Sequence, residues 1–253
     1  MRLIHPSIAR GFRDHALTLA LALMVVGGIA VILMSMLPPP RVAPIALLAL
    51  SAALALGVGA GMAWRVMGQA RRRRERINDD LGRMLAPAFD DSYTLVLAPR
   101  LPGVPDDLAG LLVGPVGVMA FIARRWRGRY RVRGRGWEYD TKSRAGWIPT
   151  LTNPSFDADA VADSVARWTR GALDEQTYAI AGAVAFPRGY STVVLEEPAG
   201  EIVTADNAPW WAQSIGRVQR LDPRRAARFV EAVLSASEAE AASTARTTTP
   251  EPA

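Results

Sequence analysis

Arginine alternates with other residues in the middle of the chain, and this pattern could bind phosphate groups. On a β-strand, successive side chains point to opposite faces of the sheet. Strand geometry would therefore place six arginines on one face: Arg125, Arg127, Arg129, Arg131, Arg133 and Arg135. The intervening residues, Trp126, Gly128, Tyr130, Val132 and Gly134, would share the other face. The pattern predicts a strand with one packed face and one cationic face.

Three interpretations of the cationic face remain open. Arginines repeating about every 6.7 Å could follow a nucleic-acid backbone through contacts that do not depend on base sequence. The face could instead contact an anionic membrane surface or an acidic protein partner. It could also be solvated and paired with acidic residues of its own domain. Trp126, Tyr130 and Trp137 could stack on bases, but alternation places Trp126 and Tyr130 opposite the arginines.

A hairpin precedes the arginine strand, and a mixed α/β domain is predicted around it. Leu111 to Val113 and Val118 to Ala123 are apolar runs separated by a Gly-Pro-Val-Gly turn signal. Periodicity and capping signals predict the remaining elements. These are a helix at 77–89, strands at 93–98, 137–147, 180–186 and 192–195, a loop at 100–107, and helices after Asn153-Pro154 and Asp222-Pro223. The domain would span 77–236, and a disordered tail is predicted for 237–253.

Two long uncharged segments near the N-terminus predict a membrane anchor. Residues 16–37 and 42–64 are each long enough to cross a bilayer as a helix, within an anchor region of 16–67. A short outer loop would join them. Arginines before the first span and in the basic linker 68–76 would make 1–15 and the C-terminal domain cytoplasmic. The predicted membrane-interface residues are Trp64, Arg65, Arg71, Arg72, Arg73 and Arg74. With 29 Arg to one Lys suggesting a GC-rich genome, the expected location is a bacterial inner membrane.

Composition limits the chemistry that the chain can perform. The net charge of +6 arises from residues 1–76, which carry +8, whereas residues 77–253 carry −2. Overall basicity therefore does not argue for nucleic-acid binding. The absence of cysteine excludes disulfides and thiolate metal sites, and two histidines near the N-terminus exclude a histidine-rich zinc site.

The hairpin and its surroundings resemble a known family. Residues 111–118 (LLVGPVGV), the Arg125–Arg129 segment with its Trp-x-Gly step, and Asn153-Pro154 at the head of a helix resemble the nuclease-related domain (NERD) family. The similarity covers roughly 70–236. It implies a restriction-endonuclease-like fold of the PD-(D/E)xK type, with a sheet flanked by helices.

The resemblance also implies a nuclease site, and this chain departs from it. Family members place two acidic residues and a lysine on the hairpin, so that the carboxylates hold Mg²⁺. Those positions fall at Ala109, Ile122 and Arg124, and the acid of the first helix falls near Asn78 or Asp79. Alanine and isoleucine cannot coordinate a metal, and arginine remains permanently protonated. We therefore predict a catalytically inactive domain without a cofactor.

A rearranged nuclease site is the alternative. Asp107 could move toward the vacant position through a bulge, and Asp140 with Lys142 forms a literal acid-x-Lys step whose alternation puts both side chains on one strand face. Only this alternative would need Mg²⁺. The expected function is a binding or scaffold module at the membrane, with nucleic acid, membrane lipid or an acidic protein as candidate partner. The oligomeric state stays open.

Overall fold

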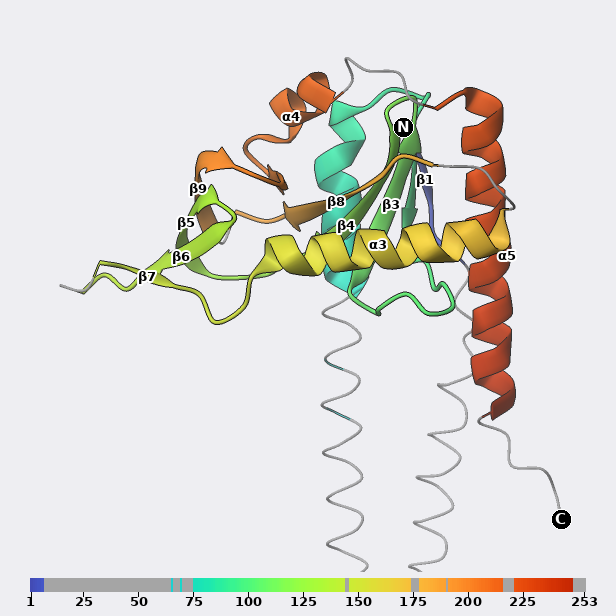
Figure 1. Cartoon of the computed structure of the whole chain (residues 1–253), viewed down its shortest axis with the longest axis horizontal. Helices are drawn as coiled ribbons and strands as arrows, with labels where there is room; N and C mark the ends of the chain where they lie inside the picture. The colour runs from blue at the N-terminus through green and yellow to red at the C-terminus, as the bar shows by residue number, and fades with distance from the viewer. Residues whose placement is uncertain are drawn as a thin grey trace, which may run out of the picture. The chain divides into compact units, whose positions relative to one another are not determined.

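A computed structural model describes most of the C-terminal part of the chain (Figure 1). The described residues are 1–6, 65, 69, 75–143, 146–173, 178–189, 191–215 and 221–247. Two compact units are present, and the first combines Met1–Ile8 with Glu75–Pro250. All elements discussed below belong to this first unit.

The prediction of a transmembrane hairpin, and with it of an inner-membrane location, is corrected. No helix among the described residues is long and apolar enough to cross a membrane. The predicted spans, 16–37 and 42–64, lie outside the described residues, as do Trp64 and the arginines 71–74. Arg65 is described, as a helical and exposed residue. The described fold is accordingly a mixed α/β domain with two sheets, and the predicted membrane hairpin is not part of it.

Six strands form the central sheet of this unit. Their order across the sheet is β1 (Arg2–Ile4), β2 (Thr94–Leu97), β3 (Leu108–Gly114), β4 (Gly117–Ala123), β8 (Ile180–Phe186) and β10 (Glu201–Thr204). The predicted hairpin is present as the antiparallel pair β3–β4, and β8 then runs parallel to β4. The outer strand β1, which pairs parallel to β2, lies in a segment predicted only as an N-terminal extension.

Helices cover both faces of this sheet (Figure 1). One face packs on α3 (Pro154–Ala172) and α5 (Pro223–Thr247), and the other packs on a helix through residues 75–85 and on α4 (Ala208–Ile215). Strand alternation divides the side chains between the two cores. Ala120 and Ile122 of β4 belong to the first core, whereas Met119 and Phe121 belong to the second.

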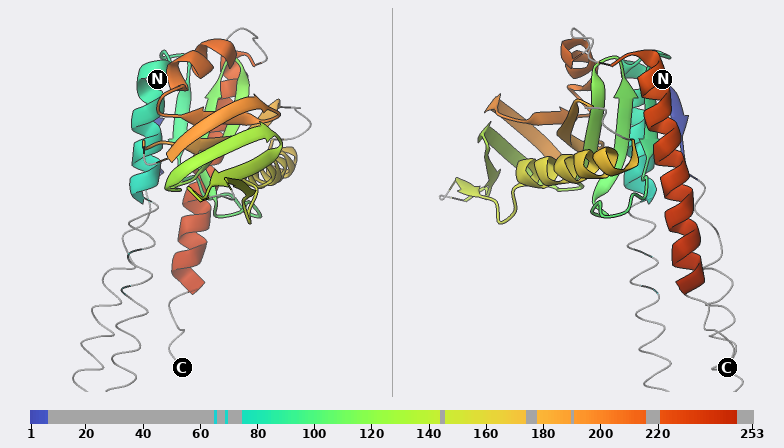
Figure 2. Two further views of the ribbon diagram at one scale, coloured as in Figure 1. Left: turned by 90° about the vertical axis from the view of Figure 1, so that its left-hand side faces the viewer. Right: turned by 45° about the vertical axis from the view of Figure 1, so that its right-hand side comes forward.

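A second, smaller sheet extends from the first core (Figure 2). Its strand order is β7 (Trp147–Pro149), β6 (Gly136–Asp140), β5 (Gly128–Gly134) and β9 (Ser191–Pro198). The predicted arginine strand is therefore an interior strand, antiparallel to β6 and parallel to β9. Val132 of β5 and its partner Trp137 of β6 are buried and join the core under α3.

The predicted helix starts are confirmed by their caps. The Asn153 side chain accepts a hydrogen bond from the Ser155 amide at 3.0 Å, and Pro154 occupies the first turn of α3. Asp222 caps α5 by accepting from the Arg224 and Arg225 amides at 3.0 and 3.1 Å. The helix α5 then continues to Thr247, past Ser237, where the sequence predicts disorder.

Candidate functional site

The β3–β4 hairpin carries the positions that the nuclease resemblance assigns to metal ligands. Leu108 pairs with Ile122, and the register shifts between Leu108 and Gly110, so that Ala109 lies at a bulge. Ala109 is buried in the core beneath the 75–85 helix, whereas Ile122 is fully buried in the core beneath α3. Both side chains are apolar and packed, so neither can bind a cation or activate water.

Arg124 follows β4 directly and organises a polar cluster at this end of the sheet. Its amide donates to the Ala185 carbonyl at 2.8 Å, which holds the backbone against β8. Its guanidinium donates to the carboxylates of Asp107 at 3.1 Å and Asp157 at 2.7 Å. Asp107 comes from the start of β3 and Asp157 from the first turn of α3. The cationic side chain thus joins three elements by neutralising two carboxylates.

A buried carboxylate on the opposite face was not singled out by sequence patterns. Asp80, on the 75–85 helix, is 5 % exposed and accepts hydrogen bonds from Arg83 and Arg188. Arg188 follows β8, so this ion pair fastens the helix to the sheet. Asn78 is equally buried on the same helix. One sequence feature could have identified Asp80. It lies beside Leu81, inside the apolar periodicity of the helix, where burying an unpaired acid would cost free energy.

Carboxylate groups lie beside the arginines of the second sheet. Arg131 donates to Glu138 at 2.7 Å, Arg133 donates to Glu196 at 3.0 Å, and Arg129 lies 3.9 Å from Asp140. Glu138 and Asp140 belong to β6 and Glu196 belongs to β9. Beyond the strand, Arg135 lies 3.5 Å from Asp159 of α3. Neighbouring strands and α3 thus supply an acidic partner to each of these four arginines.

Three of these arginines keep substantial exposure, and Arg129 and Arg131 also contact an aromatic ring. The side chains of Arg129, Arg133 and Arg135 are 55 %, 74 % and 59 % exposed. The guanidinium groups of Arg129 and Arg131 lie 5.4 and 4.8 Å from the ring centre of Trp147 on β7. Arg125 and Arg127 precede β5, in the irregular segment that follows Arg124. The face is therefore polar, partly ordered by ion pairs, and open to solvent.

The opposite face packs as alternation predicts. The ring centre of Trp126 lies 4.8 Å from that of Tyr130 and 5.7 Å from that of Trp137. The Trp137 indole donates to the Ser155 hydroxyl at 2.9 Å and thereby fixes the start of α3. Burial raises the pKa of Tyr130, with a smaller contribution from Tyr139. Trp126 thus packs against the core, whereas Tyr130 is half-buried beside it.

The residues of the predicted rearranged nuclease site do not come together: Asp107 lies apart from Asp140 and Lys142. Asp107 is held by Arg124 beside the central sheet, whereas Asp140 closes β6 in the second sheet. The expected common face for Asp140 and Lys142 is wrong, because the strand ends at Asp140. Lys142 has a φ of 54°, and its amide donates to the Asp140 carboxylate at 2.9 Å, which makes a turn. Among the described residues, no three His, Asp or Glu side chains group as a metal site would require.

Comparison with protein-family models, curated proteins and solved structures finds no match to this chain. The nuclease-related resemblance therefore stays a prediction, and a functional assignment has to rest on the residues of the chain and their contacts.

Proposed function

We propose that this domain is a non-catalytic binding module in which the nuclease framework serves recognition. The position of Arg124 carries the proposal: a permanently charged side chain bonded to Asp107 and Asp157 stands where such a nuclease would use a lysine. With Ala109 and Ile122 packed in the two cores, the hairpin lacks ligands for a catalytic cation. The site would therefore recognise a ligand by shape and charge and would not catalyse a reaction on it.

The ligand that suits the second sheet best is nucleic acid, contacted through its phosphates. Exposed ion pairs contribute only about 0.2–1 kcal/mol each, so a phosphate can replace a carboxylate partner of Arg129 or Arg133 at low cost. Trp147, already stacked with two guanidinium groups, adds an aromatic surface beside the arginines. Binding would be independent of base sequence and would weaken steeply as salt rises.

Binding is tested by fluorescence anisotropy with labelled single-stranded and double-stranded oligonucleotides, measured across a series of salt concentrations. Changing Arg127, Arg129 and Arg133 together to serine should weaken binding by more than tenfold and flatten the salt dependence, since up to three phosphate contacts are lost. The matched control changes Arg100, Arg167 and Arg170 to serine. These exposed arginines lie outside the second sheet, and their replacement removes the same charge.

Equal losses in both triple variants would show a general charge effect and would refute the assignment to this face. Absence of binding by the parent protein at low salt would refute nucleic acid as the ligand, leaving the arginines as self-paired surface residues. Catalysis is tested separately with plasmid and single-stranded DNA in Mg²⁺ or Mn²⁺. Cleavage that disappears in Asp107→Ala would overturn the non-catalytic assignment.

A further inference from the structure

The strand pairing of the second sheet fixes which side chains share the arginine face. Arg131 of β5 pairs with Glu138 of β6, and Asp140 of β6 pairs with Trp147 of β7. Arg129 lies two residues before Arg131, so alternation puts it on the same face. Four strands spaced about 4.8 Å apart make this face about 14 Å wide between its outer strands.

This width limits how a nucleic acid can approach the arginine face. The major groove of duplex DNA is about 12 Å wide and admits an α-helix or a two-stranded ribbon. Four paired strands do not fit into it, and the other face of the sheet packs on the core through Val132 and Trp137. A duplex can therefore contact the face only through its outer phosphates, whereas a single strand can lie across it with its bases accessible.

Trp147 provides a ring on which such a base can stack. Among the described residues of the four strands, it is the only aromatic side chain on this face, because the tyrosines and Trp137 alternate to the other face. Its side chain is partly exposed. The guanidinium groups of Arg129 and Arg131 lie 5.4 and 4.8 Å from its ring centre. A ring for bases beside cations for phosphates is the combination that binds single strands.

A base can displace a guanidinium group from this ring. An exposed cation–π contact contributes about two- to fivefold to an equilibrium constant, whereas a base stacked on an aromatic side chain contributes about 5- to 150-fold. The displaced guanidinium would keep its charge for a phosphate of the same strand. In a duplex the bases are paired and stacked on one another, so only an unpaired base gains this contact.

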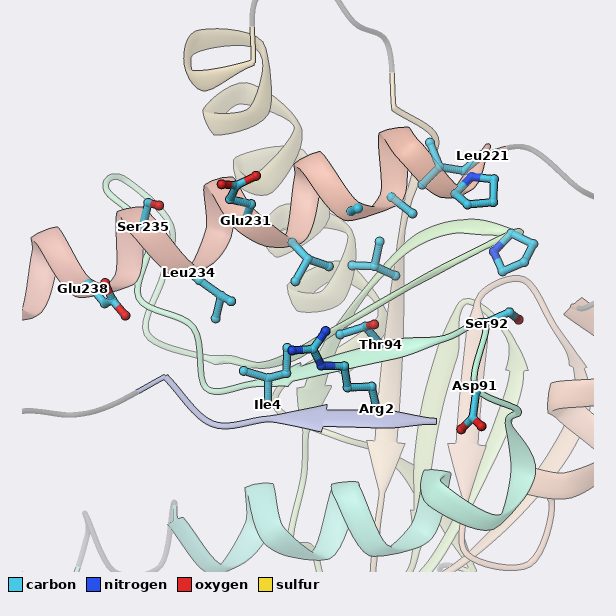
Figure 3. Close-up of a pocket in the computed structure, with 16 residues that line it drawn as sticks. Arg2, Ile4, Asp91, Ser92, Thr94, Leu221, Glu231, Leu234, Ser235 and Glu238 are labelled. Atoms are coloured by element: carbon cyan, nitrogen blue, oxygen red, sulfur yellow. The ribbon is translucent and has the colours of Figure 1, made fainter.

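The pocket beside α5 is unsuited to the same ligand (Figure 3). Its volume is about 570 Å³, and its lining includes one cationic side chain, Arg2, and the carboxylates of Asp91, Glu231 and Glu238. A lining with this excess of negative charge repels a polyanion. None of the lining residues belongs to the second sheet.

We propose that the ligand of the second sheet is single-stranded nucleic acid and that Trp147 selects it over duplex by stacking on one base. This inference rests on the nucleic-acid function proposed above, and it adds the form of the ligand and the residue that recognises it. Arg129 and Arg131 hold the phosphates beside the stacked base. Recognition does not depend on base identity, because every base has a face that can stack.

The test compares one labelled oligonucleotide, alone and annealed to its complement, by fluorescence anisotropy with the full chain. The strand is used both as DNA and as RNA, because stacking and phosphate contacts are common to the two. The parent protein should bind the single strand at least about fivefold more tightly than the duplex, since only the single strand stacks. Equal affinity for the two forms would overturn the inference, and this comparison needs no variant.

Replacement of Trp147 separates stacking from charge. Trp147→Leu should weaken single-strand binding at least about fivefold, and it should leave duplex binding and the salt dependence unchanged because no cation is lost. Trp147→Phe should keep most of the single-strand binding, since a phenyl ring also stacks. Trp210→Leu is the matched control. It removes a tryptophan of α4 that is 70 % exposed and lies outside the second sheet, so it should change neither affinity.

The possible failures of the two proposals are distinguishable. Equal losses of single-strand and duplex binding in Trp147→Leu would show that the ring only positions the arginines, which overturns the inference and leaves nucleic acid as the ligand. A similar single-strand loss in Trp210→Leu would also overturn it. Absence of binding to either form by the parent protein would refute the proposed function itself. Circular dichroism checks that every variant is folded.

Discussion

Arg124 supplies, from within the chain, the positive charge that a cation would supply between two carboxylates. The side chain is 19 % exposed, and its partners Asp107 and Asp157 are about half exposed. Its bonds join the start of β3, the end of β4 and the first turn of α3. Arg124 is therefore expected to contribute to the stability of the fold.

Replacing Arg124 with alanine should lower the free energy of unfolding by about 1–2 kcal/mol, because two charge-assisted hydrogen bonds are lost. Urea unfolding followed by circular dichroism measures the change. Arg100→Ala, which removes a surface arginine without a described ion pair, should change stability by less than about 0.5 kcal/mol. Similar losses in both variants would show that the Arg124 contacts contribute little.

Asp80 and Arg188 form the more buried ion pair, and they should be strongly coupled. Removing one partner of a fully buried pair costs about 3–5 kcal/mol. Arg188 is 33 % exposed, so we expect a smaller loss of about 2 kcal/mol in Asp80→Ala. A double-mutant cycle with Arg188→Ala measures the coupling, and additive effects of the two changes would contradict a direct interaction.

At the scale of elements, the position of α3 depends on Gly182 of β8, which has no side chain. A Cβ atom added to Gly182 of β8 would overlap the backbone carbonyl of Ala158 in α3. Backbone atoms cannot rotate away as a side chain can, so the helix itself would have to move. The close approach of α3 to β8 also positions Asp157 beside Arg124, which connects this contact to the candidate site.

Gly182→Ala should therefore destabilise the fold by about 1–3 kcal/mol through overpacking. Gly171, within α3, has no neighbour within 4 Å of an added Cβ. Gly171→Ala should stabilise the protein by up to about 1 kcal/mol, since alanine favours the helix. Thermal unfolding of both variants compares these opposite signs, and stabilisation by Gly182→Ala would show that α3 can retreat freely.

The elements that sequence patterns predict are those with local signals. The β3–β4 hairpin, β8 and the starts of α3 and α5 each have an apolar run bounded by turn or capping residues. By contrast, β1 has three residues, and only its pairing with the distant β2 makes it a strand. The short elements β10 and α4, of four and eight residues, were not predicted either.

Two further differences have physical causes that the sequence did not reveal. The alanine-rich segment after Ser237 is helical, and Ser237 is buried and accepts from the Arg100 amide at 3.1 Å. Composition suggested disorder, whereas alanine has a high helix propensity and a tertiary contact orders the chain. In the candidate site, the family resemblance singles out positions 109, 122 and 124 and stays a prediction, whereas the partners of Arg124 and the Asp80–Arg188 pair arise from tertiary contacts.

At the scale of the whole molecule, the near-neutral domain distributes its charges into local pairs. Residues 77–253 have a net charge of only −2 although the second sheet is rich in arginine, because carboxylates from neighbouring strands lie beside these arginines. Pairing of this kind keeps the arginine strand compatible with a folded sheet. Stability should consequently depend little on pH near neutrality and more strongly where buried phenols ionise.

Stability should fall at alkaline pH because two tyrosines resist ionisation in the fold. Burial, with a smaller contribution from Asp90, raises the pKa of Tyr93 above 10.0, and burial also raises the pKa of Tyr130. The folded state therefore binds these protons more tightly than the unfolded state. Their stabilisation is complete below the unfolded pKa near 10 and is lost as pH rises through the higher folded values.

Urea unfolding at pH 8 and above pH 10 tests this dependence. The double variant Tyr93→Phe, Tyr130→Phe should lose less stability on this change of pH than the parent, although its baseline lacks the Tyr130 hydrogen bond to Arg127. Tyr139→Phe, at an exposed position, should reduce the alkaline loss only slightly, through the contribution of Tyr139 to the raised pKa of Tyr130. An alkaline loss as steep in the double variant as in the parent would assign the effect to other groups.

The strand β1 also constrains the order in which the domain can fold. Arg2 and its partner Thr94 are about 90 positions apart, and closing a loop of that length costs about 4 kcal/mol of chain entropy. Three residues of parallel pairing cannot offset this cost until β2 and β3 already present a formed edge. The strand β1 therefore docks late, and its amides should exchange with solvent deuterium faster than those of β3 and β4. The pocket beside α5, whose lining includes Ile4 of β1 and Thr94 of β2, would thus be completed in the last step of folding.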